Sequence, residues 1–545
     1  MALDKEPEAG ASREEVEPLD NNQSPVLPDS DISVLYKSNG AKLLSDFGRR
    51  ISSDEKSEDS GGWTPMLLLA GATCCLGSAL PAGYNIGVMG NSADIMKDFC
   101  NQSVEERYGV QISDDGLYLL WSTIVSIFLI GGVTGSLTAS LLADKLGRRC
   151  ALSIGNVCGI IGAIAFLLTP TLNSIEFFLL GRLFVGLSGG LATSLLPTYM
   201  TEAAPIKLRG AVGVLCQLGI TCGVLLGQIG GLASVLGTKD HWHYMLAAFS
   251  PLCMISIVLL YILPESPKYL FVVKEERESA LQALSRFRNM DRVLLQKEIT
   301  DLEEEYTSKS TDSSWTIARV FREPTLRLPL MLVCLLQFGQ QLSGINAVFY
   351  YSNEIFKNAQ LDAETSQYAT IGTGVINVGM ALISVPVMSC FGRKTLLNAS
   401  VYSTIACQLL LCVSLALRDS YGYMKWVCIA AVLAFVLFYG IGLGPIPYFI
   451  GSELFDVGPR SAAMSMGSVC NWGGNFIVGM TFTQMQKVFD SYSFLVFAAC
   501  MLFLVLFCRK YLPETRGKTT IEVAASITQG LRSRPNEITS GINVT

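Results

Sequence analysis

The stretch PTYMTEAAPIKLRG, residues 197–210, returns later in the chain as PYFIGSELFDVGPRS, residues 447–461. Each copy carries a glutamate seven residues before an arginine, Glu202 and Arg209 in the first copy and Glu453 and Arg460 in the second. Two further pairs of stretches repeat at a similar spacing: DKLGRR (144–149) with SCFGRK (389–394), and PESPKYL (264–270) with PETRGK (513–518). The chain is therefore predicted to contain two copies of one design.

The composition indicates what that design is. Of the 545 residues, 50% are hydrophobic and only 16% are charged, whereas an average soluble domain is about 25% charged. Since a membrane-spanning helix needs about 20 apolar residues, the sequence predicts twelve spans, at 66–89, 117–142, 151–169, 178–200, 212–233, 245–263, 328–352, 368–389, 395–417, 425–450, 460–480 and 491–511. We expect an all-α polytopic membrane protein whose two six-helix halves face each other across a central cavity.

Five regions follow from this pattern: an acidic, disordered cytosolic tail (1–62), a first six-helix half (63–263), a cytosolic helical linker (264–327), a second half (328–511) and a cytosolic C-terminal tail (512–545). Lys and Arg crowd the short loops on one side of the predicted spans, for example in DKLGRR and FGRK. The positive-inside rule makes that side cytosolic, together with both termini. Asn101, in the sequon NQS, then lies on the outer side as a glycosylation site.

The seventh predicted span contains GQQLSGINAVFYYS, residues 339–352, which is unusually polar for a membrane helix. An amide or hydroxyl that leaves water without a partner costs about 1–3 kcal/mol, so such groups usually face a bundle interior or a wet cavity. Gln340 and Asn346 would not share a face of a straight helix. The pair Ser343-Gly344 between them is a typical place for a kink, which could turn both side chains toward the cavity.

These motifs, together with GRLFVG (181–186), GPIPYF (444–449) and NWGGNFIVGM (471–480), resemble the sugar porter family of the major facilitator superfamily, and most of all the facilitative glucose (hexose) transporters of animals. The likeness extends over residues 66–518. It implies the major facilitator fold and alternating access. It also implies sugar contacts at Gln217, Gln340, Gln341, Asn346, Asn377, Tyr448, Trp472 and Asn475.

The same resemblance implies ion pairs between helices that close the cytosolic side in the outward-facing state. The residues concerned recur at matched positions in the two halves: Asp144, Arg148, Glu202, Arg209, Glu265, Glu453, Arg460 and Glu514. The pattern is incomplete in one place, because Ser389 stands where the first copy has Asp144. The chain also departs from the glucose transporters at Gly440, where the family usually has an acidic residue, and at Tyr448, where many members have Trp.

The positions of the acidic residues indicate whether transport is coupled to protons. All of them fall in tails, loops or span ends, and none lies in the middle of a predicted span. Proton-coupled sugar porters carry an acidic residue in the first span, where this chain has Asn85, and a neutral amide cannot release a proton. We therefore expect facilitated diffusion of D-glucose or a related hexose. A carrier of fructose, of another monosaccharide or of a polyol, a proton-coupled symporter, and a non-transporting sugar sensor are the alternatives.

The expected partners of such a protein are the lipid bilayer around it and a small sugar as its substrate. We expect neither a nucleic acid nor a cofactor. We expect a plasma-membrane protein that works as a monomer. No nucleophile–base pair and no metal-binding motif is evident, so an enzyme is not expected. Nearly all of the 16 cysteines fall within or at the ends of spans, where they are interpreted as small buried hydrophobic residues.

Overall fold

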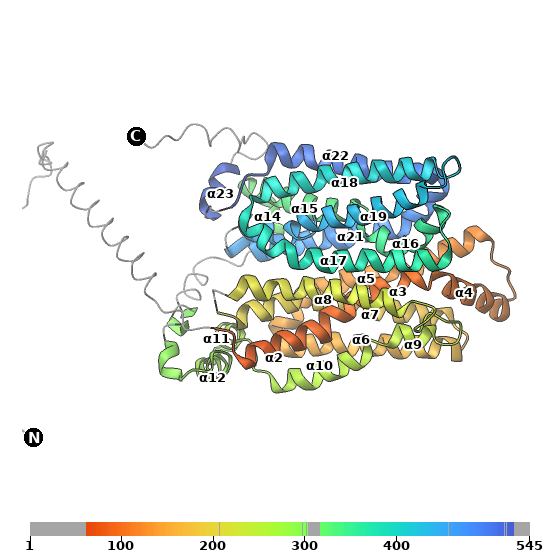
Figure 1. Cartoon of the computed structure of the whole chain (residues 1–545). Helices are drawn as coiled ribbons and strands as arrows, with labels where there is room; N and C mark the ends of the chain where they lie inside the picture. The colour runs from red at the N-terminus through yellow and green to blue at the C-terminus, as the bar shows by residue number, and fades with distance from the viewer. Residues whose placement is uncertain are drawn as a thin grey trace, which may run out of the picture. The chain divides into compact units, whose positions relative to one another are not determined.

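The computed structural model describes residues 62–205, 208–296, 298–300, 302–303, 317–455, 457–516, 518 and 520–527. The predicted N-terminal tail, apart from Gly62, lies outside these residues, as do residues 528–545. The elements of the described part are helices (Figure 1). This confirms the predicted all-α class.

The first half consists of helices that pack closely on one another. They are α2 (Pro65–Cys74), the π-helical turn η1 (Cys75–Ala79), α3 (Leu80–Asn91), α4 (Ala93–Tyr108), α5 (Asp114–Leu146), α6 (Arg148–Thr171), α7 (Ile175–Ala203), α8 (Arg209–Gly230), α9 (Trp242–Ala247) and α10 (Ser250–Ile262). Glycines permit the close contacts between these helices. A Cβ atom at Gly83 would lie 1.9 Å from the backbone oxygen of Ile220 in α8, and one at Gly186 would lie 2.0 Å from that of Phe128 in α5. In a membrane the hydrophobic effect does not drive helices together, because lipid tails are as apolar as the side chains. Helices therefore associate through close packing, which small residues at their crossing points allow.

The linker contains α11 (Pro267–Val272), α12 (Arg277–Arg288), the 3₁₀ turn η3 (Arg292–Leu295), α14 (Ile317–Arg322) and the turn η4 (Pro324–Leu326). Its helix α12 is fastened to the first half. Arg288 donates to the carbonyl of Ala203 at 2.6 Å, and the hydroxyl of Thr64 donates to the carbonyl of Phe287 at 2.6 Å.

The second half comprises α15 (Arg327–Leu342), α16 (Ile345–Asn358), α17 (Ala363–Cys390), α18 (Arg393–Ala416), α19 (Met424–Ile441), α20 (Ile446–Leu454), α21 (Val457–Phe489), the turn η5 (Asp490–Tyr492) and α22 (Ser493–Tyr511). A further helix, α23 (Thr520–Ile527), lies in the segment predicted as the C-terminal tail. It contacts α20, and its side chains Val523 and Ile527 are buried.

Within the described residues, ten helical segments are long and apolar enough to cross a membrane. A shorter apolar helix, Leu215–Gly230, lies within α8, and the long segment Ala462–Tyr511 covers both α21 and α22. One helix or a run of successive helices thus occupies each of the twelve predicted spans, the first span being filled by α2, η1 and α3. Three spans are interrupted, between α9 and α10, between α15 and α16, and between α19 and α20.

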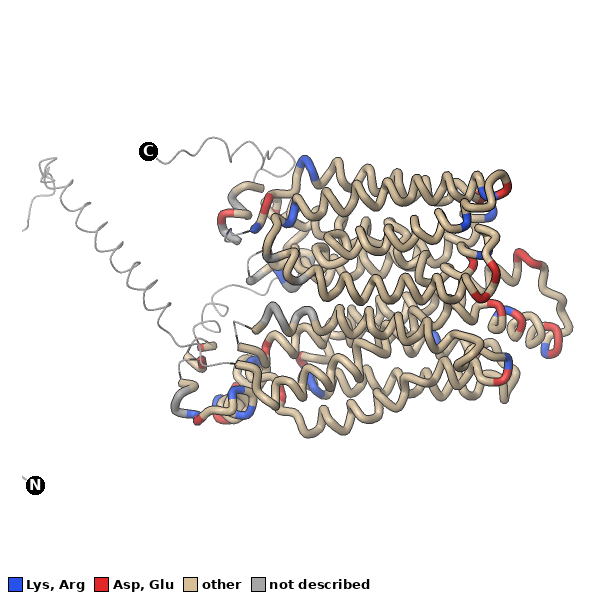
Figure 2. Tube along the Cα trace, viewed as in Figure 1, with Lys and Arg blue, Asp and Glu red and all other residues tan. Residues whose placement is uncertain are grey.

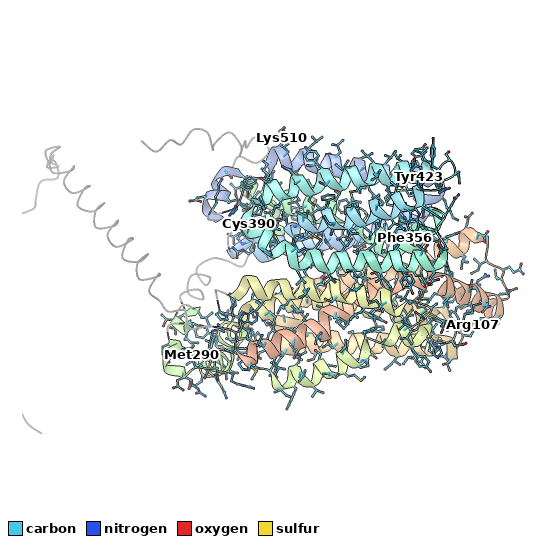
Figure 3. All side chains as sticks on the ribbon, in the orientation of Figure 1. Arg107, Met290, Phe356, Cys390, Tyr423 and Lys510 are labelled. Atoms are coloured by element: carbon cyan, nitrogen blue, oxygen red, sulfur yellow. The ribbon has the colours of Figure 1, made fainter. Side chains whose placement is uncertain are left out.

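The two halves contact each other mainly through three pairs of helices: α5 with α21, α8 with α17, and α3 with α16. In Figure 1 the red-to-yellow helices of the first half lie along the cyan-to-blue helices of the second. Figure 2 shows that charged residues gather at the two ends of the bundle and leave the middle largely free. We call the end with α11, α12 and α23 the linker end, and the opposite end, with α4, the α4 end. Figure 3 shows Met290, Cys390 and Lys510 at the linker end, and Arg107 and Tyr423 at the α4 end.

Candidate functional site

A cavity with an empty volume of about 750 Å³ lies between the two halves. Helices α3, α5, α7 and α8 line it from the first half, and α15 to α17 and α19 to α21 from the second. Its lining residues carry side-chain amides, hydroxyls and aromatic rings, and none of those that the structure describes is charged. Such a lining both donates and accepts hydrogen bonds without offering a fixed charge.

The seventh predicted span is broken as expected. Helix α15 ends at Leu342 and α16 begins at Ile345, and Gly344 between them has φ +81°. A Cβ atom there would lie 2.8 Å from the ring of Phe497, so both the backbone and the space require glycine. The amide of Gln408 donates to the freed carbonyl of Ser343 at 2.8 Å.

The break brings two predicted sugar contacts together. The amide nitrogen of Asn346 donates to the amide oxygen of Gln341 at 2.5 Å, and both residues line the cavity. Gln341 belongs to α15 and Asn346 to α16. Because the two helices are separate, the two side chains can point the same way although they would not on one straight helix. The predicted break at Ser343-Gly344 is therefore present, and Asn346 faces the cavity as predicted, but its partner there is Gln341 and not Gln340.

Seven of the eight predicted contacts line the cavity; they are Gln217, Gln341, Asn346, Asn377, Tyr448, Trp472 and Asn475. Tyr448 lies in a membrane span yet is 47% exposed, because it faces the cavity. The amide oxygen of Asn475 is buried without a hydrogen-bond partner among the described residues. The ring of Trp472 meets that of Phe128 edge to face at 6.1 Å.

Gln340 is the eighth, and it is not among the lining residues. It is fully buried, and its amide nitrogen donates to the carbonyls of Leu443 and Gly444, at 3.2 and 2.6 Å. The structure therefore shows it bonded to the break between α19 and α20 and not facing the cavity.

Sequence reasoning missed several lining residues, among them Asn471, Tyr439, Thr193 and Thr221. Asn471 was within reach of prediction, because it stands directly before Trp472 in NWGGN. The others carry no comparable signal, since a single Thr or Tyr in an apolar span is common.

At the linker end, Arg148 is the centre of an ion-pair cluster in the first half. Its guanidinium binds both oxygens of Glu202, at 3.0 and 3.2 Å, and reaches Asp144 at 3.4 Å. Glu265 accepts the backbone N–H groups of Arg148 and Arg149 at the start of α6, at 3.0 and 3.2 Å. Burial raises the pKa of Glu265, although these N–H donors and the charge of Arg149 act in the opposite direction.

The second half repeats this cluster around Arg393, which sequence reasoning did not name as a gate residue. Arg393 binds Glu453 at 3.1 and 3.2 Å, and Glu514 accepts its backbone N–H at 2.7 Å. The repeated motifs could have identified it, because SCFGRK places Arg393 at the position of Arg148. Among the described residues, Arg460 donates to the carbonyl of Phe455, at 3.1 and 3.2 Å. The side chains of Arg209 and Ser389 lie outside the described residues.

Each of these clusters joins helices of one half. Among the described residues, side-chain bonds between the two halves gather instead at or toward the α4 end. Lys97 pairs with Glu354 at 2.6 Å, and two further ion pairs, Asp94 with Lys357 and Asp115 with Lys487, link the same halves. In the described conformation the α4 end is therefore tied across the halves.

The comparisons with known proteins agree with this architecture. A family model described as "Sugar (and other) transporter" matches residues 71–526. Solute carrier family 2, facilitated glucose transporter member 3 of Mus musculus is 39% identical over 461 residues, which cover 85% of this chain and 92% of that protein. Facilitated glucose transporter member 1 of Gallus gallus is 36% identical over 480 residues, 88% of this chain and 97% of that protein.

Among solved structures, the xylose transporter XylE from E. coli in a partially occluded inward open conformation superposes with a TM-score of 0.69 at 23% identity, covering 84% of this chain and all of that one. At this level of identity the likeness shows the fold.

Proposed function

The chain belongs to the sugar transporter family, and on that premise we propose that it carries D-glucose or a related hexose across a membrane, down its gradient, by alternating access. The observation that supports this most directly is the uncharged, amide-lined cavity between the two halves. A hexose is neutral, and its hydroxyls both donate and accept, as amides do. Transport also needs binding that reverses easily, which a charge in the cavity would oppose.

Within the cavity, the proposed sugar-binding residues are the seven predicted contacts that line it, and Asn471 beside them. Trp472 offers a flat apolar face to the CH side of a sugar ring. The proposed role of Gln340 is indirect, because its amide is already bonded to the break between α19 and α20.

The proposed orientation has the linker end in the cytosol and the α4 end outside, in the plasma membrane. Lys and Arg in the short loops at the linker end support it. With the α4 end tied across the halves, the described conformation corresponds to the inward-facing side of the cycle. The clusters around Arg148 and Arg393 then hold each half together as a rigid unit, while the halves rotate against each other.

A proton-coupled sugar symporter is the second candidate, because one structural neighbour is named a proton:xylose symporter. Three features oppose it here. The described cavity lining has no carboxylate, and Asn85 occupies the position of the first-span acid. Gly440, where the family resemblance implies an acidic residue, has no room for one, since a Cβ atom there would lie 2.6 Å from Cβ of Met380.

The test is uptake of labelled D-glucose into proteoliposomes, with L-glucose as the control, D-fructose as the competitor, and with and without a pH gradient. We expect stereoselective uptake that stops at equilibrium and ignores the gradient. Replacing Asn346 by Ala should raise the half-saturating glucose concentration about tenfold, since it removes one hydrogen bond to the sugar. The matched control is Asn156→Ala, a buried amide bonded to Ser78 and Ser256 within the first half, which should leave that concentration unchanged. Uptake of neither sugar, or accumulation above equilibrium, would contradict the proposal.

A further inference from the structure

The break between α19 and α20 leaves backbone carbonyls without their helical partners. In a continuous helix the carbonyl of Leu443 would accept the N–H of residue 447, but that residue is a proline and has none. In a continuous helix the N–H of Tyr448 would donate to the carbonyl of Gly444. Here it donates to the carbonyl of Pro445 at 3.2 Å. Unpaired carbonyls are costly inside a membrane, so something else must satisfy them.

Gln340 of α15 satisfies both carbonyls, and Gln337 of the same helix binds the first turn of α20. The amide nitrogen of Gln340 donates to Leu443 and Gly444, at 3.2 and 2.6 Å, and that of Gln337 donates to Pro447 at 3.0 Å. The two glutamines are three residues apart and therefore lie on one face of α15. Both are buried almost completely.

A single asparagine orients both glutamines. The amide nitrogen of Asn471, in α21, donates to the amide oxygens of Gln337 and Gln340, at 2.8 and 2.7 Å. Since each amide oxygen is held, each amide nitrogen points toward the break. We call Gln337, Gln340 and Asn471 the amide clamp; it connects α21, α15 and α20.

The amide clamp is continuous with the cavity. Asn471 lines the cavity, and the amide oxygen of Gln340 also accepts from Gln341 at 3.4 Å. On its other side the clamp holds α20, a helix of nine residues that carries Tyr448 at the cavity and Glu453 at the linker end. Glu453 in turn pairs with Arg393.

We propose that the amide clamp transmits a change in the cavity to α20: Asn471 contacts the sugar, Gln337 and Gln340 are positioning residues that act through it, and sugar binding therefore moves Tyr448 and Glu453 together. This inference rests on the proposed function, because it takes a sugar as the occupant of the cavity. Gln337 is the informative member, since it is not among the cavity-lining residues and contacts the sugar only through Asn471.

The first test is transport by Gln337→Leu, which keeps the size of the side chain and removes both of its hydrogen bonds. The maximal transport rate should fall about five- to tenfold, because the two buried hydrogen bonds of Gln337 are lost together. The half-saturating glucose concentration should change less than about twofold, because the sugar contacts remain in place. The control is Asn156→Leu, which also removes a buried bridging amide but lies within the first half; it should keep the wild-type rate.

The second test needs no sugar. Hydrogen–deuterium exchange of the full-length protein should be faster in peptides covering residues 442–454 of Gln337→Leu than in wild type, and unchanged in Asn156→Leu. Equal exchange in all three proteins, or a fall in rate that Asn156→Leu shares, would overturn the amide clamp. If the wild-type protein carries no hexose, the proposed function fails, and the exchange measurement still decides whether the clamp holds α20.

Discussion

Lys97 of α4 and Glu354 of α16 form an ion pair between the two halves, with 2.6 Å between Nζ and Oε1 and with 11% and 23% of their side chains exposed. The rings of Tyr118 and Trp121 lie 5.1 and 5.6 Å from the same ammonium group. A pair shielded in this way is screened less by salt than one in open water. It is therefore the strongest candidate for the contact that keeps the α4 end closed.

Breaking this pair should open the α4 end. We expect Lys97→Met or Glu354→Gln to cost the closed state about 1–2 kcal/mol, hence a shift of about five- to thirtyfold toward the open state. The measurement uses Ser122→Cys, at a buried position whose hydroxyl bonds Thr483 across the halves at 3.3 Å. A membrane-impermeant maleimide modifies the new cysteine, and mass spectrometry follows the reaction. The modification should be faster by that factor in the variants that break the ion pair than in the protein that keeps it.

Two controls separate this effect from a general loss of charge. Arg107→Gln breaks an ion pair with Glu176 that lies within the first half at the same end, and it should not change the modification rate. The charge reversal Lys97→Glu with Glu354→Lys should restore slow modification. Equal rates in all variants would show that the pair does not hold this end closed.

The second prediction concerns Asn85. The fully buried Arg182 donates to the backbone oxygen of Asn85 at 2.8 Å and to those of Ile124 and Val125 at 3.2 and 3.4 Å. The side-chain oxygen of Asn85 is buried without a partner. Asn85→Asp would thus place a carboxylate beside a guanidinium that now binds only neutral carbonyls among the described residues.

Uptake by Asn85→Asp should therefore depend on pH at the acidic end of the range, because the guanidinium favours the ionised carboxylate. The change is at most about tenfold per pH unit, since one titrating group changes its protonated fraction by at most that factor. Wild-type uptake should stay constant over the same range. Initial rates between pH 5.5 and 8 check this. A wild-type rate that follows the pH gradient would contradict facilitated diffusion.

The third prediction concerns pH and Glu265. Its pKa is raised by burial above the usual value of 4.5, so the folded protein binds this proton more tightly than the unfolded chain does. The stabilisation that this proton provides is fully present below the pKa that Glu265 has in the unfolded chain. It is lost as pH rises through the pKa that Glu265 has in the folded protein. We expect the apparent Tm of the wild type, minus that of Glu265→Gln, to become more positive as pH falls from 7 to 5. A difference that stays flat or moves in the opposite direction would show that Glu265 keeps an ordinary or lowered pKa.

The fourth prediction tests the orientation through Asn101, which is exposed on α4. If the α4 end faces outside, the protein expressed in animal cells should lose mass on treatment with an endoglycosidase, and Asn101→Gln should not. The sequons at Asn22 and Asn543 lie in the predicted cytosolic tails, so they serve as internal controls. An unglycosylated wild-type protein would argue against this orientation.

Much of the site could be predicted because it is repeated or local. The duplicated motifs identify Arg148, Glu202 and Glu265 and their counterparts, and the Ser343-Gly344 pair marks the break that brings Gln341 to Asn346. Gln340 shows where this reasoning stops. Its neighbour Gln341 faces the cavity while Gln340 faces the α19–α20 break, and which of two adjacent amides does which depends on how α15 lies against α20.

The sequence alone determined the two repeats and the twelve spans, because hydropathy, span length and helix breaks are properties of short segments. Its resemblance to the sugar porters implied seven of the residues that line the cavity. Only the tertiary structure decided which partners meet across the halves. Lys97 and Glu354 are 257 positions apart, and the amide clamp joins three helices. Such contacts depend on how whole helices dock, and the docking energy is spread over many packed side chains, so no short stretch of sequence encodes it.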